Sequence, residues 1–147
     1  MTSAVGGTLV PVPSLPLPGR PEYRLSAGLT RRLRKKVLAF APDIIHIATP
    51  DVVGFQALRL AKKHGIPVVS TYHTHFSSYL SYYGVGWLES ALWRYARWFY
   101  GTCDEVYVPT PAMEHELQAH GVDTTLRLWP RGIELDRFSP ERRSDAW

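Results

Sequence analysis

His73 is the residue whose position in this sequence favours chemistry most clearly. It directly follows a β-branched run, residues 67–72, which predicts a buried strand that ends at this point. An imidazole at the end of such a strand could donate a hydrogen bond to a hydroxyl or phosphate group, or transfer a proton. The same position also suits a histidine that only hydrogen-bonds to backbone. The residues alone leave both interpretations open.

Three further loops follow predicted strands and form a candidate binding edge together with the loop 73–78. They cover residues 48–51, 109–111 and 130–132. In open parallel sheets, ligands bind beyond the carboxyl ends of the strands. Three of the four loops hold a histidine, an arginine or a hydroxyl group beside a predicted helix N-terminus, where anions are stabilised. The sequence therefore predicts a binding site at this edge.

Metal, serine-nucleophile and P-loop chemistry find little support. His73 and His75 could form a two-ligand arm, but zinc needs at least three protein ligands and no third one has suitable spacing. The segment Glu114-His115-Glu116 is interpreted as a solvated helix face, because it lacks the helical His-x-x-x-His pair. No Gly-x-Ser-x-Gly motif occurs, and residues 84–86 (GVG) are too short for a phosphate-binding loop. We therefore expect neither a metal nor a cofactor.

These loops can be positioned by a regular alternation of strands and helices, which the hydrophobic pattern predicts from residue 27 onward. The expected order is a helix up to Pro42, strand 44–47, a helix opened by Thr49-Pro50-Asp51 and closed by Gly65, strand 67–72, helix 87–100, strand 105–108, helix 110–121 and strand 126–129. Short connections in this order are typical of a right-handed, doubly wound sheet. The expected fold class is α/β, a Rossmann-like parallel sheet with helices on both faces.

The first 26 residues are rich in proline and have a different character. Residues 8–12 are expected to form a short edge strand, where proline is tolerated. The rest of this region, up to Ser26, is interpreted as an extended loop. Four apolar side chains in it could bury against the body of the protein: Leu15, Leu17, Tyr23 and Leu25.

Composition limits the class of protein. The chain has 147 residues, of which 45% are hydrophobic and 20% charged, as in one globular domain. Its net charge of +4 permits anionic partners, but no nucleic-acid recognition motif occurs, so no nucleic-acid partner is expected.

No apolar run approaches the roughly 20 residues of a membrane span, and no signal-peptide pattern is visible, so a cytoplasmic location is expected. The lone Cys103 excludes an internal disulfide framework and is expected to be buried at a helix end.

Two predicted helices have unusual surfaces. The first carries five cations that could contact anionic lipid or could form an ordinary solvated face. These cations are Arg31, Arg32, Arg34, Lys35 and Lys36. The second, residues 87–100, is rich in aromatic side chains and could lie at a membrane interface. For this second helix we favour a wide buried face that covers the sheet.

Four segments carry a recognisable pattern in their order and spacing. They are residues 42–50 (PDIIHIATP), 65–74 (GIPVVSTYHT), 108–113 (VPTPAM) and 131–140 (RGIELDRFSP). Together they resemble the N-terminal domain of family 4 retaining glycosyltransferases, and the similarity covers nearly the whole chain. The resemblance is closest to bacterial GDP-mannose-dependent α-mannosyltransferases and to plant-type sulfoquinovosyltransferases that glycosylate diacylglycerol lipids.

This resemblance implies a GT-B enzyme, in which two Rossmann-like domains face a cleft. The N-terminal domain mainly receives the acceptor, and the C-terminal domain binds the nucleotide-sugar. The implied reaction is retaining transfer of a hexose, with mannose from GDP-mannose favoured, to a lipid or another hydroxyl acceptor. His73 matches the family's catalytic histidine, which would donate a hydrogen bond near the reacting sugar. The residues expected around it in the cleft are Thr49, Thr74, Ser78, Thr110, Arg131 and Gly132.

The chain also departs from the family pattern. Residues 1–140 are expected to form a partial N-terminal domain without the family's first strand, Gly-Gly loop and first helix. Residues 141–147 would begin the crossover to a C-terminal domain that the sequence lacks. We expect the isolated chain to transfer little. Alternatively, the chain is a non-catalytic binding module, or a split-enzyme subunit that pairs with a separate chain supplying the donor domain.

Overall fold

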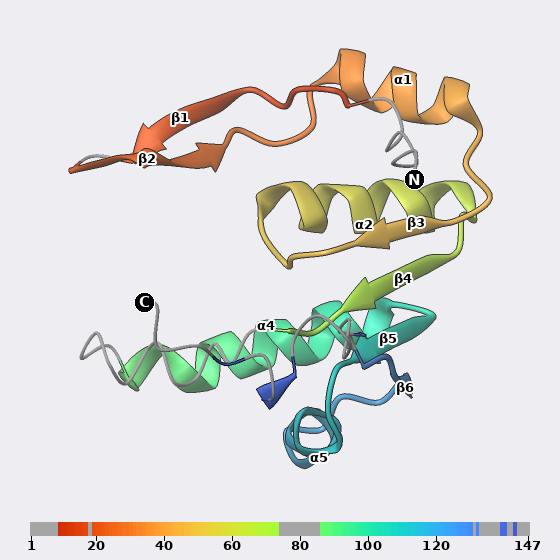
Figure 1. Ribbon diagram of the computed structural model, residues 1–147. Coiled ribbons are helices and arrows are strands. Elements are labelled where there is room, and N and C mark those ends of the chain that lie inside the picture. The colour runs from red at the N-terminus through yellow and green to blue at the C-terminus, as the bar shows by residue number, and fades with distance from the viewer. Residues whose placement is uncertain are drawn as a thin grey trace.

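The computed structural model describes residues 9–17, 19–73, 86–130, 132, 139–140 and 143. Figure 1 shows a hairpin and a helix followed by a sheet with its connecting helices. The elements are β1 (Ser14–Leu17), β2 (Arg20–Ser26), α1 (Arg31–Phe40), β3 (Ile45–Ile47), α2 (Val52–His64), β4 (Val68–Thr71), the 3-10 turn η1 (Gly86–Leu88), α4 (Glu89–Thr102), β5 (Glu105–Val108), α5 (Pro111–Ala119) and β6 (Thr125–Leu128).

The parallel sheet confirms the predicted α/β class. Its strands lie in the order β3-β4-β5-β6, and every neighbouring pair is parallel. The register places Ile47 opposite Ser70, and Ser70 opposite Val106. The buried Ser70 hydroxyl donates a hydrogen bond to the Ile47 carbonyl at 2.8 Å, so this polar group costs little to bury. All four strands therefore end at one edge of the sheet.

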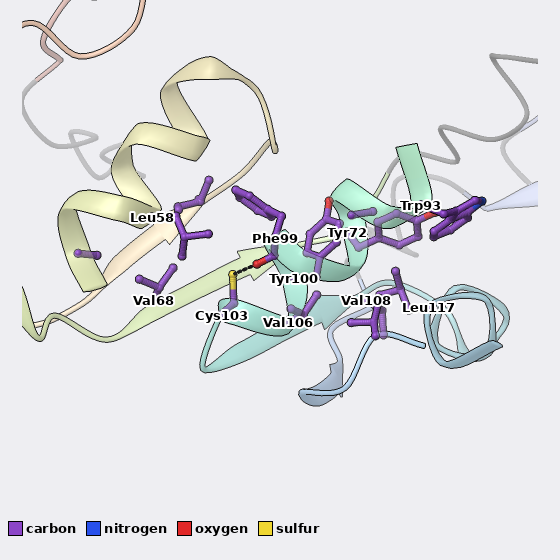
Figure 2. Close-up of a cluster of buried hydrophobic side chains, with 14 residues drawn as sticks. Leu58, Val68, Tyr72, Trp93, Phe99, Tyr100, Cys103, Val106, Val108 and Leu117 are labelled. Carbon is purple, nitrogen blue, oxygen red and sulfur yellow. Dashed lines mark hydrogen bonds between the residues drawn. The ribbon is translucent and has the colours of Figure 1, made fainter. Parts of the chain in front are cut away.

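The described helices that share the core lie on one face of this sheet. The core joins Leu58 of α2, Phe99 of α4 and Leu117 of α5 with inward residues of the strands, such as Val68 and Val106 (Figure 2). This arrangement follows from the topology. When strands follow one another in chain order, right-handed connections place every connecting helix on the same face.

Aromatic residues of α4 dominate the core, in agreement with the buried face favoured from the sequence. Trp93, Phe99 and Tyr100 are buried, and Tyr72 stacks edge-on against Tyr100 at 5.5 Å between ring centroids. Cys103 is buried at the C-terminal end of α4, as predicted, and its thiol donates a hydrogen bond to the Phe99 carbonyl (Figure 2). Burial raises the pKa of the Cys103 thiol to about 12, so this thiol is unreactive.

Helix ends follow the predicted capping chemistry with one correction. Gly65 ends α2 in the left-handed conformation, and Thr110 caps α5 ahead of Pro111, both as expected. At the start of α2, however, the cap is Asp51 rather than Thr49. The Asp51 carboxylate accepts a hydrogen bond from the Gly54 amide at 2.8 Å. A carboxylate at this position satisfies a free amide and complements the helix dipole at once.

The proline-rich region differs most from its prediction. Residues 9–13 form no strand, whereas β1 and β2 form an antiparallel hairpin in the stretch expected to be a loop. Gly19 supplies the positive φ of +79° at the turn. Leu15 and Leu25, expected to bury, are 69% and 59% exposed. In Figure 1 the hairpin projects away from the parallel sheet, so its apolar residues have no described core to enter.

Gly54 provides a test of the tight junction between β3 and α2. A Cβ at this position would collide with the Thr49 carbonyl oxygen and would lie 2.9 Å from Cγ2 of Ile47. We expect Gly54→Ala to lower the free energy of unfolding by about 1–3 kcal/mol, because the obstructing atom belongs to the backbone. Urea denaturation measures the change.

The control is Gly101→Ala, on α4. There the nearest heavy atom to a new Cβ is 3.8 Å away, so alanine should stabilise the helix by up to about 1 kcal/mol. Equal stabilities of the Gly54→Ala variant and the unchanged protein would contradict the close junction.

Asp104 links the two halves of the sheet and predicts a pH dependence. Its carboxylate accepts hydrogen bonds from the Val68 amide at 2.7 Å and from the Lys62 ammonium. These bonds lower its pKa, the Val68 amide most. A lowered pKa gives stability that is present above the unfolded value of about 3.9 and is lost as the pH falls below it.

Melting curves between pH 7 and pH 3 test this expectation. The Asp104→Asn variant should melt at a lower temperature at pH 7 and should lose less stability than the unchanged protein as the pH falls. Asp43→Asn, which removes an exposed carboxylate, is the control. If the melting temperatures of Asp104→Asn and of the unchanged protein fell equally between pH 7 and pH 3, the expected contribution of the Asp104 carboxylate would be refuted.

Candidate functional site

A hollow of about 480 Å³ opens at the carboxyl end of the parallel sheet. We call it the strand-end hollow. Its lining residues close or follow the four strands: His46, Ala48, Thr71, His73, Pro109, Trp129, Pro130 and Gly132. Segments far apart in the sequence meet here because parallel strands end at one edge.

His46 faces this hollow because it alternates with two core residues. Ile45 and Ile47 pack on the helix-covered face, so the side chain between them lies on the opposite face. The Nε2 atom of His46 lies 2.7 Å from Oγ1 of Thr71 on the neighbouring strand. This hydrogen bond orients the imidazole at the rim of the hollow.

Aromatic rings extend the surface beside His46. The Tyr107 ring meets the His46 ring edge-on at 6.3 Å between centroids, and the Trp129 ring lies 5.3 Å from that of Tyr107. Trp129 is half exposed, while its backbone amide donates to the Val108 carbonyl at 2.8 Å. The result is an apolar wall with polar edges on a rigid strand end.

The chain directly before His73 is firmly held. The Tyr72 ring is fully buried, and its hydroxyl donates a hydrogen bond to the Glu116 carboxylate at 3.0 Å. Burial first, and then Glu116, raise the pKa of Tyr72 above its usual value, so the hydroxyl remains a donor. The Tyr72 amide also donates to the Tyr107 carbonyl at 2.9 Å. These contacts position His73 from one side.

His73 itself has an unused polar atom. Its Nδ1 atom is buried and has no hydrogen-bond partner within the described ranges. Buried polar atoms are satisfied in the great majority of cases, and Nε1 of the core residue Trp93 is the other exception within the described ranges. Since His73 also lines the hollow, its imidazole can form a hydrogen bond with a ligand bound there. Nowhere in the described part do three His, Cys, Asp or Glu side chains gather as metal ligands.

The structure brings some of the predicted site residues together. His73 and Gly132 line the same hollow. Thr49 is not part of the lining, although its neighbour Ala48 is. The Thr110 hydroxyl accepts a hydrogen bond from the Met113 amide and caps α5, while its neighbour Pro109 lines the hollow. The predicted site residues Thr74, Ser78 and Arg131 lie outside the described residues.

Sequence reasoning missed His46, Thr71 and Trp129. In the sequence, residues 44–47 (IIHI) form a short apolar run, which is typical of a strand that is covered on both faces. The sequence nonetheless indicates where His46 lies, because in a strand a polar residue between two isoleucines is on the opposite face from both of them. No sequence pattern predicts the hydrogen bond between His46 and Thr71, since this bond depends on the register between β3 and β4.

The five cations of α1 lie apart from the strand-end hollow. They project from a helix with no fully buried residue. Arg34 is held most closely, because its guanidinium donates to the Leu29 carbonyl and to Oε1 of Gln56 on α2. No helix in the described ranges is long and apolar enough to span a bilayer.

Comparison with known proteins adds the family. The model of Glycosyltransferase Family 4 matches residues 3–137. The chain is 35% identical to the sulfoquinovosyl transferase of Arabidopsis thaliana over 95% of its own length and 28% of that protein. It is 33% identical to a GDP-mannose-dependent α-mannosyltransferase of Mycobacterium tuberculosis, over 80% of the chain and 31% of the relative.

A third relative is the α-monoglucosyldiacylglycerol synthase of Streptococcus pneumoniae. It is 28% identical over 93% of this chain and 32% of its own length. The chain thus spans about a third of the length of these curated relatives. No solved structure matches it significantly. With a family match over nearly all of its length, the chain belongs to glycosyltransferase family 4.

Proposed function

We propose that this protein takes part in the retaining transfer of a hexosyl group from a nucleotide-sugar to a hydroxyl acceptor, and that the chain supplies the acceptor side. The observation that carries the proposal is the strand-end hollow, in which His46, Thr71 and His73 meet in a family 4 domain. Hydroxyl acceptors need oriented hydrogen-bond partners, and two imidazoles and a threonine hydroxyl supply them.

Within this proposal, His73 is the catalytic residue. Its imidazole donates a hydrogen bond near the reacting sugar and stabilises charge as the bond to phosphate breaks. The other cleft residues, Thr49, Thr74, Ser78, Thr110, Arg131 and Gly132, would surround the substrates. Gly132 has the strongest support among them, because it lines the hollow beside His73. No metal has a role in this mechanism.

The favoured donor is GDP-mannose and the favoured acceptor is a lipid. Two kinds of relative support these choices. One is named for its dependence on GDP-mannose, and another is named as a glucosyldiacylglycerol synthase. A lipid acceptor agrees with the cations of α1, which could hold the protein on the cytoplasmic face of an anionic membrane.

A reconstituted transfer assay tests the proposed function. The chain is mixed with the C-terminal part of the Mycobacterium tuberculosis relative, with labelled GDP-mannose or UDP-glucose as donor and diacylglycerol vesicles as acceptor. We expect labelled glycolipid only when both protein parts are present, with GDP-mannose preferred. Transfer by the chain alone would contradict the division of roles. If the two parts co-elute as a complex yet transfer neither sugar, the proposed function is wrong.

The open edge of the sheet favours a second candidate, a binding module that pairs with a separate donor-domain chain. Among the described strands, β3 pairs only with β4, so its other edge carries free backbone groups. Co-purification of a donor-domain protein from the native cell would support this pairing. A chain that remains monomeric in its presence would argue against it.

A further inference from the structure

Trp129 gives the strand-end hollow an apolar surface beside its hydrogen-bonding groups. It directly follows β6, and 54% of its side chain is exposed although tryptophan is a large apolar residue. Single exposed apolar residues are common on protein surfaces, but this one lines the same hollow as His46, Thr71 and His73. An aromatic ring thus lies beside three side chains that can form hydrogen bonds.

The Trp129 ring is held in position before any ligand arrives. Its backbone amide donates a hydrogen bond to the Val108 carbonyl at 2.8 Å, which continues the pairing of β5 with β6. The Tyr107 ring meets the Trp129 ring at 5.3 Å between centroids and at an angle of 66°. The Tyr107 hydroxyl in turn donates to the Glu105 carboxylate at 3.4 Å. A ring that is already fixed loses little conformational entropy when it binds a ligand.

The described lining of the hollow favours an uncharged ligand. None of the described lining residues is Asp, Glu, Lys or Arg. On neighbouring strands, Glu105 and Arg127 neutralise each other in an ion pair at 2.8 Å. A phosphate group is bound most strongly by cationic side chains that form charge-assisted hydrogen bonds. The described surface therefore fits a neutral group better than a phosphate.

The polar side of the hollow fits hydroxyl groups. Nδ1 of His73 is buried and has no partner within the described ranges. The Thr71 oxygen lies 2.7 Å from Nε2 of His46 and has a further lone pair for a second hydrogen bond. An acyl chain in the hollow would leave these groups dry and unpaired, which is costly. The ligand must therefore offer both apolar surface and hydroxyl groups.

A pyranose ring matches both sides of the hollow. One face of such a ring presents C–H groups, which the negative face of an aromatic ring attracts, and its edge presents hydroxyl groups. We infer that the hollow binds an uncharged pyranose ring that stacks on Trp129, and that this contact sets a preference for a sugar ring over an open-chain alcohol. The inference rests on the proposed function and deepens it, because the ring belongs either to the transferred hexosyl group or to an acceptor that already carries a sugar.

Binding of a simple mannoside to the chain tests the inference. Methyl α-D-mannopyranoside is titrated into the ¹⁵N-labelled protein, and the indole N–H signal of Trp129 is followed by NMR. Glycerol, an open-chain polyol, is titrated in parallel. We expect a saturable shift with the mannoside and none with glycerol at an equal concentration of hydroxyl groups. No saturable shift with the mannoside, or an equal one with glycerol, would overturn the inference.

Variants separate stacking on Trp129 from a general loss of tryptophan. Trp129→Ala should weaken mannoside binding about tenfold, whereas Trp129→Phe, which keeps an aromatic face, should stay within about threefold of the unchanged protein. The control is Trp87→Ala, because Trp87 is 78% exposed and does not line the hollow. Saturation-transfer NMR follows the ligand signals, so it needs no indole at position 129, and circular dichroism checks the folding of each variant. Equal binding by Trp129→Ala and the unchanged protein would overturn the role of Trp129.

Kinetics in the reconstituted assay identify which sugar occupies the hollow. Trp129→Ala is compared with the unchanged protein, with diacylglycerol and monoglucosyldiacylglycerol as acceptors. A rise in the KM for GDP-mannose with both acceptors assigns the ring to the donor, whereas a rise in KM confined to the glucosylated acceptor assigns it to the acceptor. Unchanged KM values throughout would overturn the stacking contact. Because mannoside binding is measured without transfer, a failed transfer assay would overturn the proposed function and leave the binding result to decide this inference.

Discussion

Replacing His73 with alanine is expected to slow hexosyl transfer about 100- to 1,000-fold in the reconstituted assay. Loss of one preorganised donor at a developing charge typically has an effect of this size. The structure supports this role, because Tyr72, the residue before His73, is held by its hydrogen bond to Glu116, and Nδ1 of His73 has no partner within the described ranges. The rate constant kcat should fall more than KM rises, because the hydrogen bond strengthens in the transition state.

His115→Ala is the matched control for this prediction. His115 is an exposed histidine of α5, so its loss should leave the rate within about twofold. His46→Ala gives an intermediate test, since that residue lines the hollow without being the proposed donor. A His73→Ala enzyme that retained full kcat would remove this residue from the mechanism.

The second large effect concerns stability. Phe99 is fully buried in the last turn of α4 and contacts the rings of Tyr95, Trp98 and Tyr100. We expect Phe99→Ala to lower the free energy of unfolding by about 3–5 kcal/mol, because it removes a large apolar side chain and leaves a cavity. Most domains have a total of only about 5–15 kcal/mol, so a large part of the stability would be lost.

Trp87→Ala is the control for the core. Trp87 is 78% exposed in η1, so the same kind of truncation should change stability by less than about 0.5 kcal/mol. Urea denaturation monitored by circular dichroism compares both variants with the unchanged protein. Similar small losses in the two would show that α4 does not organise the core as described.

Local chemistry made much of the fold predictable from the sequence. Strand β5 coincides with its predicted range, and Gly65 and Thr110 end and begin helices as expected. These features depend on residues within a few positions of each other. The choice of Asp51 over Thr49 as a cap was less predictable, because either side chain can accept a hydrogen bond from a free amide, and the cap is Asp51 because α2 begins at Val52.

Long-range features were harder to predict. Whether β1 and β2 would pair depended on chain reversal at Gly19, in a proline-rich stretch whose composition favours a loop. The face that each helix covers follows from strand order, which a sequence pattern does not specify. The candidate site likewise has one part that local sequence predicts and another that depends on long-range pairing. His73 was predicted from its place after a strand, whereas the bond between His46 and Thr71 depends on register.

The attachment of α1 has an evolutionary consequence. This helix contributes no fully buried side chain, and polar bonds from Arg34 and from the Leu29 amide both reach Oε1 of one residue, Gln56. Substitutions on its surface therefore leave the aromatic core of α4 untouched. Selection can therefore change the charge of α1 without a loss of folding, provided that Gln56 and its two contacts remain. Surface charge and thermodynamic stability can thus change independently in this domain.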